Sequence, residues 1–480
     1  MTEFLVHQAP AIPAGIAVGA RVVLDDSAVF LDRDFLYGGS PWRLVRLPGG
    51  AKAVAESWAN GGTVKPGQER FARTLIQQGL LRILSTASLA IDDVDVIIPV
   101  RDDVSSLRTL LAQLEGFHVT IVDDASRNDI LIEQTSRVFG AHLVKLPTNL
   151  GPGGARNAGV RATKRPFVWF LDCDVTLESA KDAFERLSRH FVDPQVSVVA
   201  PRIRGQGGTS IRDSFEVRFS PLDMGPTSAL VAPGGAVSYV PSASLLVRRE
   251  AFGDGFDERL RVGEDVDFVW RQYDASRLTR YDAQVVVFHQ ARTTWRAWWH
   301  QRVSYGASAT QLSQRHGSRL APLKGDAWTI IAWLSALIGK PAVGIRIVGA
   351  TRNHLKTYLK GADDANASAN ELVRRGVLGA APHMARSLIR TFGPLVALAA
   401  LHPKLRRRAL ALYLFGTAWR WKKTPVRLAD IPLAIADDTA YAVGVFKGAL
   451  TERNFAALKP NITKPQMGLR DVIGLRAKNG

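Results

Sequence analysis

The segment Phe167-Val168-Trp169-Phe170-Leu171-Asp172-Cys173-Asp174-Val175 joins an apolar run to two carboxylates one residue apart. The apolar part has the length and composition of a buried strand. Two acids that end a buried strand lose hydration, a cost that an opposing cation offsets. A divalent metal that holds a diphosphate is such a cation, because hard cations take carboxylate and phosphate oxygens together. The acid pair therefore indicates either a metal-diphosphate site or an ordinary strand-end turn.

Three apolar segments precede this one, at residues 94–102, 119–126 and 141–146, with helical or turn patterns between them. Strands that alternate with helical stretches predict an α/β fold with a mainly parallel sheet. In such sheets ligands bind beyond the carboxyl ends of the strands. The residues expected at those ends are Pro99, Asp123, Asp124, Asp172 and Asp174.

A glycine-rich turn opens a predicted helix at Asn149-Leu150-Gly151-Pro152-Gly153-Gly154-Ala155-Arg156-Asn157-Ala158-Gly159. It matches neither the dinucleotide-binding nor the P-loop glycine pattern. One interpretation is a tight turn and nothing more. The other is anion contact at a helix N-terminus, with Arg156 near a diphosphate.

A second group of acids opens another predicted helix, in Gly263-Glu264-Asp265-Val266-Asp267. These acids either complement the helix dipole, at about 0.3–1 kcal/mol each, or supply a general base for an attacking hydroxyl. Glu264 and Asp265 are the candidates for that base. His289 ends a later apolar strand and is either structural or a third metal ligand beside the acid pair.

Five segments in this order resemble family-2 glycosyltransferases with the GT-A fold. The segments are Ile97-Ile98-Pro99-Val100, Val122-Asp123-Asp124-Ala125-Ser126, Gly154-Ala155-Arg156-Asn157-Ala158-Gly159, Asp172-Cys173-Asp174 and Gly263-Glu264-Asp265-Val266-Asp267. They span about residues 92–310, which we therefore expect to be a GT-A catalytic domain.

The resemblance implies a role for each acid. Asp123 or Asp124 would hold the uracil and ribose of a UDP-sugar, and Asp172 and Asp174 would hold ribose and metal-bound diphosphate. The metal would be Mg or Mn. Asp265 would be the base of an inverting transfer.

Three segments outside those motifs are similar to the mycofactocin glycosyltransferases, namely residues 38–47, 237–243 and 452–460. That family glycosylates a peptide-derived redox cofactor, and the resemblance implies glucose units from UDP-glucose in β-1,4 linkage. Residues 310–440 match only in hydrophobic character.

The N-terminal segment, residues 1–88, has strand-like alternation from Arg21 to Asp34 and a helical stretch from Gln68 to Gln78. Short strands followed by helices resemble a small α+β winged-helix domain of the peptide-recognition type. The segment is either a packing appendage or a docking domain for the acceptor. A DNA-binding winged helix is disfavoured, because the segment has no marked Lys/Arg stripe.

The chain of 480 residues carries 62 Lys plus Arg against 44 Asp plus Glu, a formal charge of +18. Basic clusters gather beside apolar runs in residues 311–480, for example Lys404–Arg408 and Arg420–Lys423, which favours an anionic membrane surface over nucleic acid. No run there reaches the roughly 20 apolar residues of a clean membrane span. We expect a helical, membrane-associating region, with buried soluble helices as the alternative.

Cysteine usage and the N-terminus favour a reducing compartment. Cys173 is the single cysteine, so no intrachain disulfide forms. No signal-peptide pattern is visible. We expect the protein at the cytoplasmic face of the cell membrane, or alternatively in the cytoplasm.

Between the catalytic and C-terminal regions lies Trp295-Arg296-Ala297-Trp298-Trp299-His300-Gln301-Arg302. Trp298 and Trp299 are either core or membrane-belt residues or a platform for an acceptor sugar. Gln301 and Arg302 loosely resemble the acceptor-side helix of processive relatives, although the motif is incomplete.

The sequence thus predicts an inverting, metal-dependent glucosyltransferase of the mycofactocin type. One alternative is a cell-envelope polysaccharide or lipid glycosyltransferase. A third hypothesis is a non-catalytic peptide-binding or nucleic-acid-binding protein on a degenerate scaffold. The intact acids at positions 172, 174, 264 and 265 argue against that third hypothesis.

Overall fold

The computed structural model describes residues 15–418, 427–464 and 467, except residues 33, 48, 293, 361 and 363. The chain divides into two compact units: one holds residues up to Phe30 together with Leu36–Ala291, and the other holds Leu31–Phe35 and residues from Arg292 onward. The first unit joins the N-terminal segment to most of the predicted catalytic domain. The basic cluster Arg420–Lys423 lies outside the described residues.

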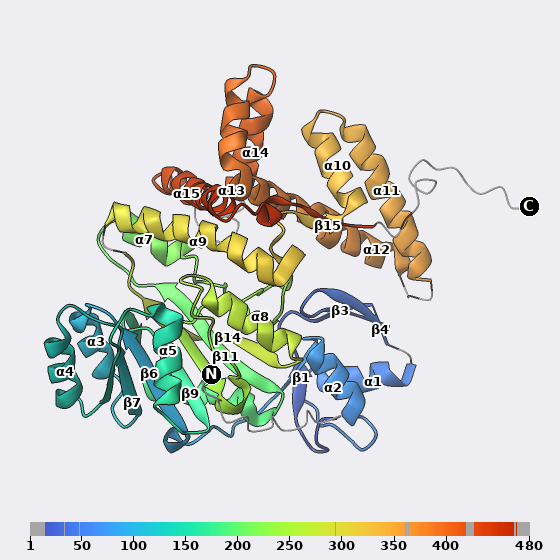
Figure 1. Ribbon diagram of the computed structural model, residues 1–480. Coiled ribbons are helices and arrows are strands. Elements are labelled where there is room, and N and C mark those ends of the chain that lie inside the picture. The colour runs from blue at the N-terminus through green and yellow to red at the C-terminus, as the bar shows by residue number, and fades with distance from the viewer. Residues whose placement is uncertain are drawn as a thin grey trace, which may run out of the picture. The chain divides into compact units, whose positions relative to one another are not determined.

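The core of the first unit is a mixed sheet with the strand order β10-β14-β11-β13-β9-β6-β7-β8, and β12 pairs with β14 (Figure 1). Its strands are β6 (Val94–Val100), β7 (His118–Asp123), β8 (His142–Lys145), β9 (Phe167–Leu171), β10 (Val175–Leu177), β11 (Val196–Gly205), β12 (Ala229–Val231), β13 (Ser244–Arg248) and β14 (Leu278–His289). The α/β prediction is confirmed.

The sheet is mixed, not mainly parallel as the sequence predicts. Strands β9, β6, β7 and β8 run parallel, as do β11 and β14. In contrast, β13 runs antiparallel to both β9 and β11, and β10 and β12 run antiparallel to β14. Strands buried on both faces have the same apolar pattern in either direction, so the sequence pattern does not reveal these reversals.

Helices cover this sheet and carry the loops of interest. They are α3 (Val104–Leu111), α4 (Asp129–Val138), α5 (Gly151–Arg161), α6 (Ala180–Ser188), α7 (Ile211–Phe219) and α8 (Glu264–Asp274). Helix α5 packs on β6 and β7, and α8 packs on β14. Every residue of β9 is buried between β13 and β6, which agrees with its uninterrupted apolar sequence.

The N-terminal segment is an α+β arrangement. Its elements are β1 (Val22–Leu24), β2 (Val29–Asp32), β3 (Phe35–Gly38), β4 (Arg43–Arg46), α1 (Gly49–Trp58), α2 (Glu69–Gln77) and β5 (Leu81–Ile83). Two buried ion pairs bind it to the catalytic part of the unit: Arg73 Nη1 lies 2.9 Å from Asp193 Oδ2, and Arg280 Nη2 lies 2.8 Å from Asp25 Oδ2. The winged-helix identity stays a prediction.

The second unit is almost entirely helical. Its elements are α9 (Trp295–His316), β15 (Lys324–Asp326), α10 (Ala327–Leu337), α11 (Pro341–Tyr358), α12 (Ala365–Val373), α13 (Gly379–Leu401), α14 (Arg406–Ala418), α15 (Asp430–Thr451) and β16 (Asn461–Thr463). Helices α9 and α15 pack backbone to backbone: a Cβ on Gly306 would lie 2.0 Å from the Tyr441 carbonyl oxygen, and one on Gly444 would lie 2.0 Å from that of Val303. In the described part of the chain, residues 365–401 form one helical stretch long and apolar enough to cross a membrane.

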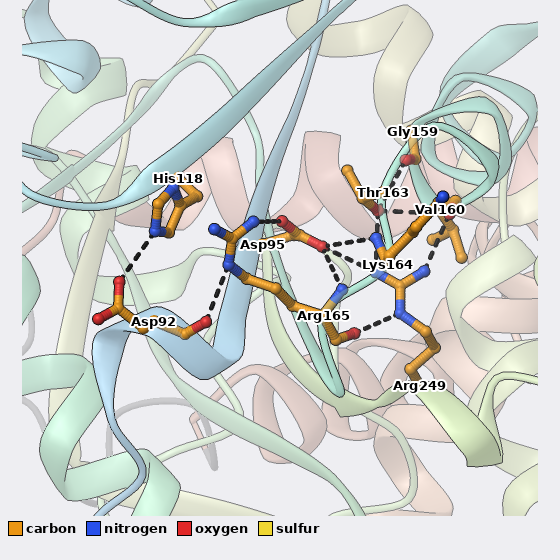
Figure 2. Close-up of polar contacts among 9 residues, drawn as sticks. All are labelled: Asp92, Asp95, His118, Gly159, Val160, Thr163, Lys164, Arg165 and Arg249. Atoms are coloured by element: carbon orange, nitrogen blue, oxygen red, sulfur yellow. Dashed lines mark hydrogen bonds and ion pairs between the residues drawn. The ribbon is translucent and has the colours of Figure 1, made fainter.

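A buried carboxylate, Asp95 at the start of β6, fastens the far end of α5 to the sheet (Figure 2). It accepts hydrogen bonds from the backbone N–H groups of Lys164 and Arg165 and from the side chains of Arg165 and Arg249, at 2.8–3.1 Å. Arg249 also donates to the carbonyl of Val160 at 2.9 Å. The Asp95 carboxylate at the start of β6 therefore binds both the loop after α5 and the residue that follows β13.

Asp95→Ala should lower the free energy of unfolding by about 3–5 kcal/mol, because it leaves two arginines and two N–H groups without their buried acceptor. Urea unfolding followed by tryptophan fluorescence measures the effect. Asp92→Ala is the control: Asp92 is 89% exposed in its pair with His118, so its loss should cost about 0–1 kcal/mol. Equal effects of the two changes would contradict this role of Asp95.

Candidate active site

The carboxyl end of β9 delivers Asp172 to the site. The backbone N–H of Asp172 donates to the carbonyl of Ala243 at 3.0 Å. Ala243 directly precedes β13, which pairs with β9 so that Ser244 faces Leu171. The antiparallel strand β13 therefore brings a residue from far along the chain beside the acid pair.

Arg156 is the buried cation that meets Asp172. It projects from α5 and is 1% exposed. Its Nη2 binds Asp172 Oδ1, and its Nη1 lies 3.0 Å from Glu264 Oε1. Its guanidinium also lies 5.5 Å from the centre of the Phe256 ring. One arginine thus joins the end of β9 to the first turn of α8.

Asp265 lies beside this ion network. Its Oδ2 accepts a hydrogen bond from the backbone N–H of Ser242 at 3.3 Å, and its Oδ1 accepts from the N–H of Val266 at 2.8 Å. Gly263 precedes α8 with φ +87°, a left-handed conformation that favours glycine. Neighbouring residues 242 and 243 therefore contact Asp265 and Asp172 respectively.

The network holds more acid than base, which shifts the pKa values of its carboxyls. Burial and the nearby Asp265 charge raise the pKa of Glu264 to about 7, against the opposing effect of Arg156. Burial likewise raises the pKa of Asp265, although the N–H groups of Val266 and Ser242 oppose it. Burial lowers the pKa of Arg156, but Asp172 and Glu264 outweigh that effect and raise it overall. Glu264 and Asp265 therefore bind a proton more readily than exposed carboxyl groups do.

Asp174 pairs with His289 rather than with Arg156. His289 Nε2 lies 3.4 Å from Asp174 Oδ1, because β10 and β14 align Val175 opposite His289. Among the described residues no group of three or more His, Cys, Asp and Glu side chains is arranged to hold a metal. Asp174 and His289 would supply a cation with one carboxylate oxygen and one imidazole nitrogen, so phosphate oxygens and water would have to complete its ligand set. Burial raises the pKa of Cys173 well above its usual range, which disfavours a nucleophilic thiolate.

The predicted nucleotide residues Asp123 and Asp124 lie at the end of β7. Asp124 accepts from the N–H groups of Leu150 and Gly151 at 2.6 and 2.9 Å. The first turn of α5 is therefore met by the protein's own carboxylate, and anion contact at this turn stays a prediction. Asp123 accepts from the N–H of Ser126 at 3.0 Å, and Pro99 lies in the neighbouring strand β6, opposite Val122.

The four predicted acceptor residues all lie on α9, in the second unit. Trp298 is 2% exposed, and the Arg302 guanidinium lies 4.8 Å from its ring centre. Arg302 Nε lies 3.1 Å from Asp437 Oδ1, and its Nη1 donates to Gln301 at 2.6 Å. Trp298 and Arg302 thus pack within the helical unit, whereas Trp299 and Gln301 keep partly exposed surface. Acceptor contact by these residues stays a prediction.

The sequence motifs point to Arg156 but do not predict its two carboxylate partners, and they give Ser242 and Ala243 no site role. Both residues act through backbone groups, for which side-chain chemistry gives no signal. Their position just before a strand that pairs with β9 places them at the site.

The raised pKa of Glu264 predicts a pH-dependent stability. A carboxyl with a folded-state pKa of about 7 and an ordinary value of 4.5 stabilises the fold at low pH, and this contribution is lost as the pH rises from 4.5 through 7. In metal-free buffer the thermal unfolding midpoint of Glu264→Gln should fall less over this window than that of the wild type. Glu115→Gln, on the exposed surface, should behave as the wild type does. Parallel curves for Glu264→Gln and the wild type would contradict the raised pKa.

Comparisons with known proteins identify relatives. The model of glycosyl transferase family 2 matches residues 95–256. A pre-mycofactocin glycosyltransferase of Mycobacterium tuberculosis is 34% identical over 480 aligned residues, which cover 94% of this chain and 98% of that protein. The poly(ribitol-phosphate) β-N-acetylglucosaminyltransferase TarS of Staphylococcus aureus is 26% identical over 172 residues, 34% of this chain and 28% of its own. A mannosyltransferase from Pyrobaculum calidifontis, solved with GDP-mannose and Mn²⁺, aligns at 16% identity with a TM-score of 0.41, covering 75% of this chain and 88% of that one.

Proposed function

The chain belongs to the pre-mycofactocin glycosyltransferases of glycosyl transferase family 2, and we propose that it transfers glucose from UDP-glucose, with inversion and with a divalent metal, to a peptide-derived acceptor. Membership of this family makes it an enzyme, a glycosyltransferase of the mycofactocin pathway. This sets aside the non-catalytic alternative. The other alternative, a polysaccharide or lipid glycosyltransferase, is less well supported, because the TarS match covers 34% of this chain and the pre-mycofactocin match covers 94%.

The observation that carries the proposal is that one short segment, Ser242 and Ala243, contacts both the acid after β9 and an acid of α8. Ala243 accepts the N–H of Asp172, and Ser242 donates to Asp265. Arg156, on helix α5, binds both Asp172 and Glu264. A donor diphosphate at the β9 end and a base on α8 would thereby lie close to each other, which is the arrangement that a single displacement at a sugar carbon needs.

Asp265 is the proposed base. It accepts the proton of the acceptor hydroxyl while that oxygen attacks the anomeric carbon, and UDP leaves from the opposite face. The raised pKa of Asp265 makes its carboxylate a better proton acceptor than an exposed aspartate. Glu264 holds Arg156 and so fixes the first turn of α8.

The remaining acids serve the donor in this proposal. Asp123 at the end of β7 contacts the uridine, with Pro99 beside it, and Asp124 shapes the loop at Leu150 and Gly151. A divalent cation, Mg²⁺ or Mn²⁺, would be held by Asp174 and His289, and it supplies charge stabilisation to the departing diphosphate. Asp172 orients Arg156 at the edge of that site.

We further propose a peptide-derived acceptor, as the family implies, and action at the cytoplasmic face of the cell membrane rather than free in the cytoplasm. The net charge of +18 and the apolar, basic second unit support an anionic membrane surface as a partner. In the same proposal the N-terminal segment of residues 1–88 docks the acceptor.

Asp265→Asn should lower kcat about 10²–10⁴-fold, because an amide does not accept the hydroxyl proton. Its KM for the donor should change little, since the amide retains hydrogen bonding to Ser242. The assay is UDP release from UDP-glucose with the pre-mycofactocin acceptor. Asp129→Asn, which alters only an exposed pair with Lys145, is the matched control. Unchanged kcat in Asp265→Asn would sink the assignment of the base.

Removal of divalent metal should abolish turnover, and Mn²⁺ or Mg²⁺ should restore it. His289→Ala should raise the metal concentration needed for half-maximal activity by about 10–100-fold, because one of two protein ligands is lost. Metal titrations of UDP release measure this. Full activity in excess chelator would rule out the metal part of the proposal.

A further inference from the structure

We propose that the turns of two helical hairpins, α10–α11 and α13–α14, together form a docking surface for an anionic phospholipid bilayer. We call this surface the hairpin-tip surface, and it comprises residues 338–346 and 398–410. The proposal rests on the membrane association proposed above and names the surface that carries it. It is independent of the sugar-transfer chemistry.

The α13–α14 turn exposes large apolar side chains next to a run of cations. Leu401 is 73% exposed and Leu398 is 61% exposed. The turn then continues with Lys404, and the first turn of α14 is formed by Arg406, Arg407 and Arg408. All four of these basic residues are exposed. Water solvates the cations well, but it gives exposed leucines no comparable stabilisation.

The α10–α11 turn has the same character. Ile338 is 52% exposed and Ile345 is 71% exposed, and Lys340 and Arg346 are exposed beside them. The two turns are neighbours: a Cβ on Gly339 would lie 3.4 Å from Nη2 of Arg408. Both belong to the second unit, so this contact joins parts of one compact body (Figure 1).

The charge of these hairpins is of one sign. The sequence contains no Asp or Glu between Asp326 and Asp363, and none between Glu371 and Asp430. A protein partner of mixed charge does not require such complete exclusion of acids. A phosphate-covered bilayer favours it, because basic residues bind its surface while adjacent apolar side chains enter the acyl boundary.

The surface fits interfacial docking rather than a span. One face of the first half of α13 packs inside the protein: Ile389 is 1% exposed, and Arg386 lies 3.6 Å from Asp438 on α15. Helix α13 kinks at Phe392, before Pro394, and only its last turns project. Those turns are far shorter than the ~20 residues that cross a bilayer, but interfacial helices enter it by only about 5–10 Å.

The test is co-sedimentation of the full chain with phosphatidylcholine vesicles, with and without phosphatidylglycerol, at low and raised salt. The wild type should bind the anionic vesicles, and salt should weaken binding. Lys404→Glu/Arg407→Glu/Arg408→Glu should lower the partition coefficient roughly tenfold or more. Lys164→Glu/Lys181→Glu/Arg186→Glu, an equal charge change at exposed sites of the first unit outside the N-terminal segment, should bind as the wild type does.

A second pair of variants tests the apolar part. Leu401→Gln/Leu410→Gln should weaken vesicle binding, whereas Ile130→Gln/Val138→Gln, on exposed helix α4, should not. Circular dichroism verifies that each variant is folded. UDP release with soluble acceptor should be unchanged in all four, so a failed chemical proposal and a failed membrane proposal give different results.

Equal vesicle binding by the two charge-reversal variants would overturn the proposal. So would binding that ignores phosphatidylglycerol. If the leucine variant instead disrupts a dimer seen by light scattering, and vesicles do not bind, the surface joins two copies of the chain. Tight binding of a random RNA without vesicle binding would overturn it in favour of nucleic acid.

Discussion

The site depends on one buried cation, Arg156, shared by Asp172 and Glu264. A guanidinium that is 1% exposed is tolerable only because two carboxylates bind it with directed hydrogen bonds. Those carboxylates come from β9 and α8, which are separated by more than 90 residues in the sequence. Once Arg156 is bound, the end of the strand and the start of the helix have one relative position. The proposed base and the proposed diphosphate ligands take their positions from it.

The elements that present this cluster are fixed at their opposite ends as well. Helix α5 carries Arg156 near its middle, Asp124 binds the N–H groups at its start, and the Asp95 network holds the loop that follows it. Strand β13 lies between Ala243, beside Asp172, and Arg249, which binds Asp95. Charged groups at both ends of the central strands therefore fix helix α5 and strand β13. The apolar interior between those ends needs only to be well packed.

The sequence predicts the α/β class and the segments that surround the site, because strand-end acids and a glycine-rich turn leave local patterns. Buried β9 and the acids of α8 lie where the patterns place them. The antiparallel β13 is not predictable in this way, since Leu245 and Val247 read as a buried strand in either direction. Nor are the partners of Arg156, because a pair between distant residues has no local signature. Nor is the contact between the Trp298 ring and Arg302, which tertiary packing brings about, whereas acceptor binding by Trp298 stays a prediction.

A double-mutant cycle on Arg156 and Glu264 tests most directly whether this pair organises catalysis. Arg156→Met, Glu264→Gln and the double variant would be compared with the wild type by kcat for UDP release, with the folded state verified by circular dichroism. If Arg156 acts through Glu264, the two losses are not additive, and the coupling is about 1–3 kcal/mol. Losses that add to within about 0.5 kcal/mol would show that the two residues act independently and would contradict the account.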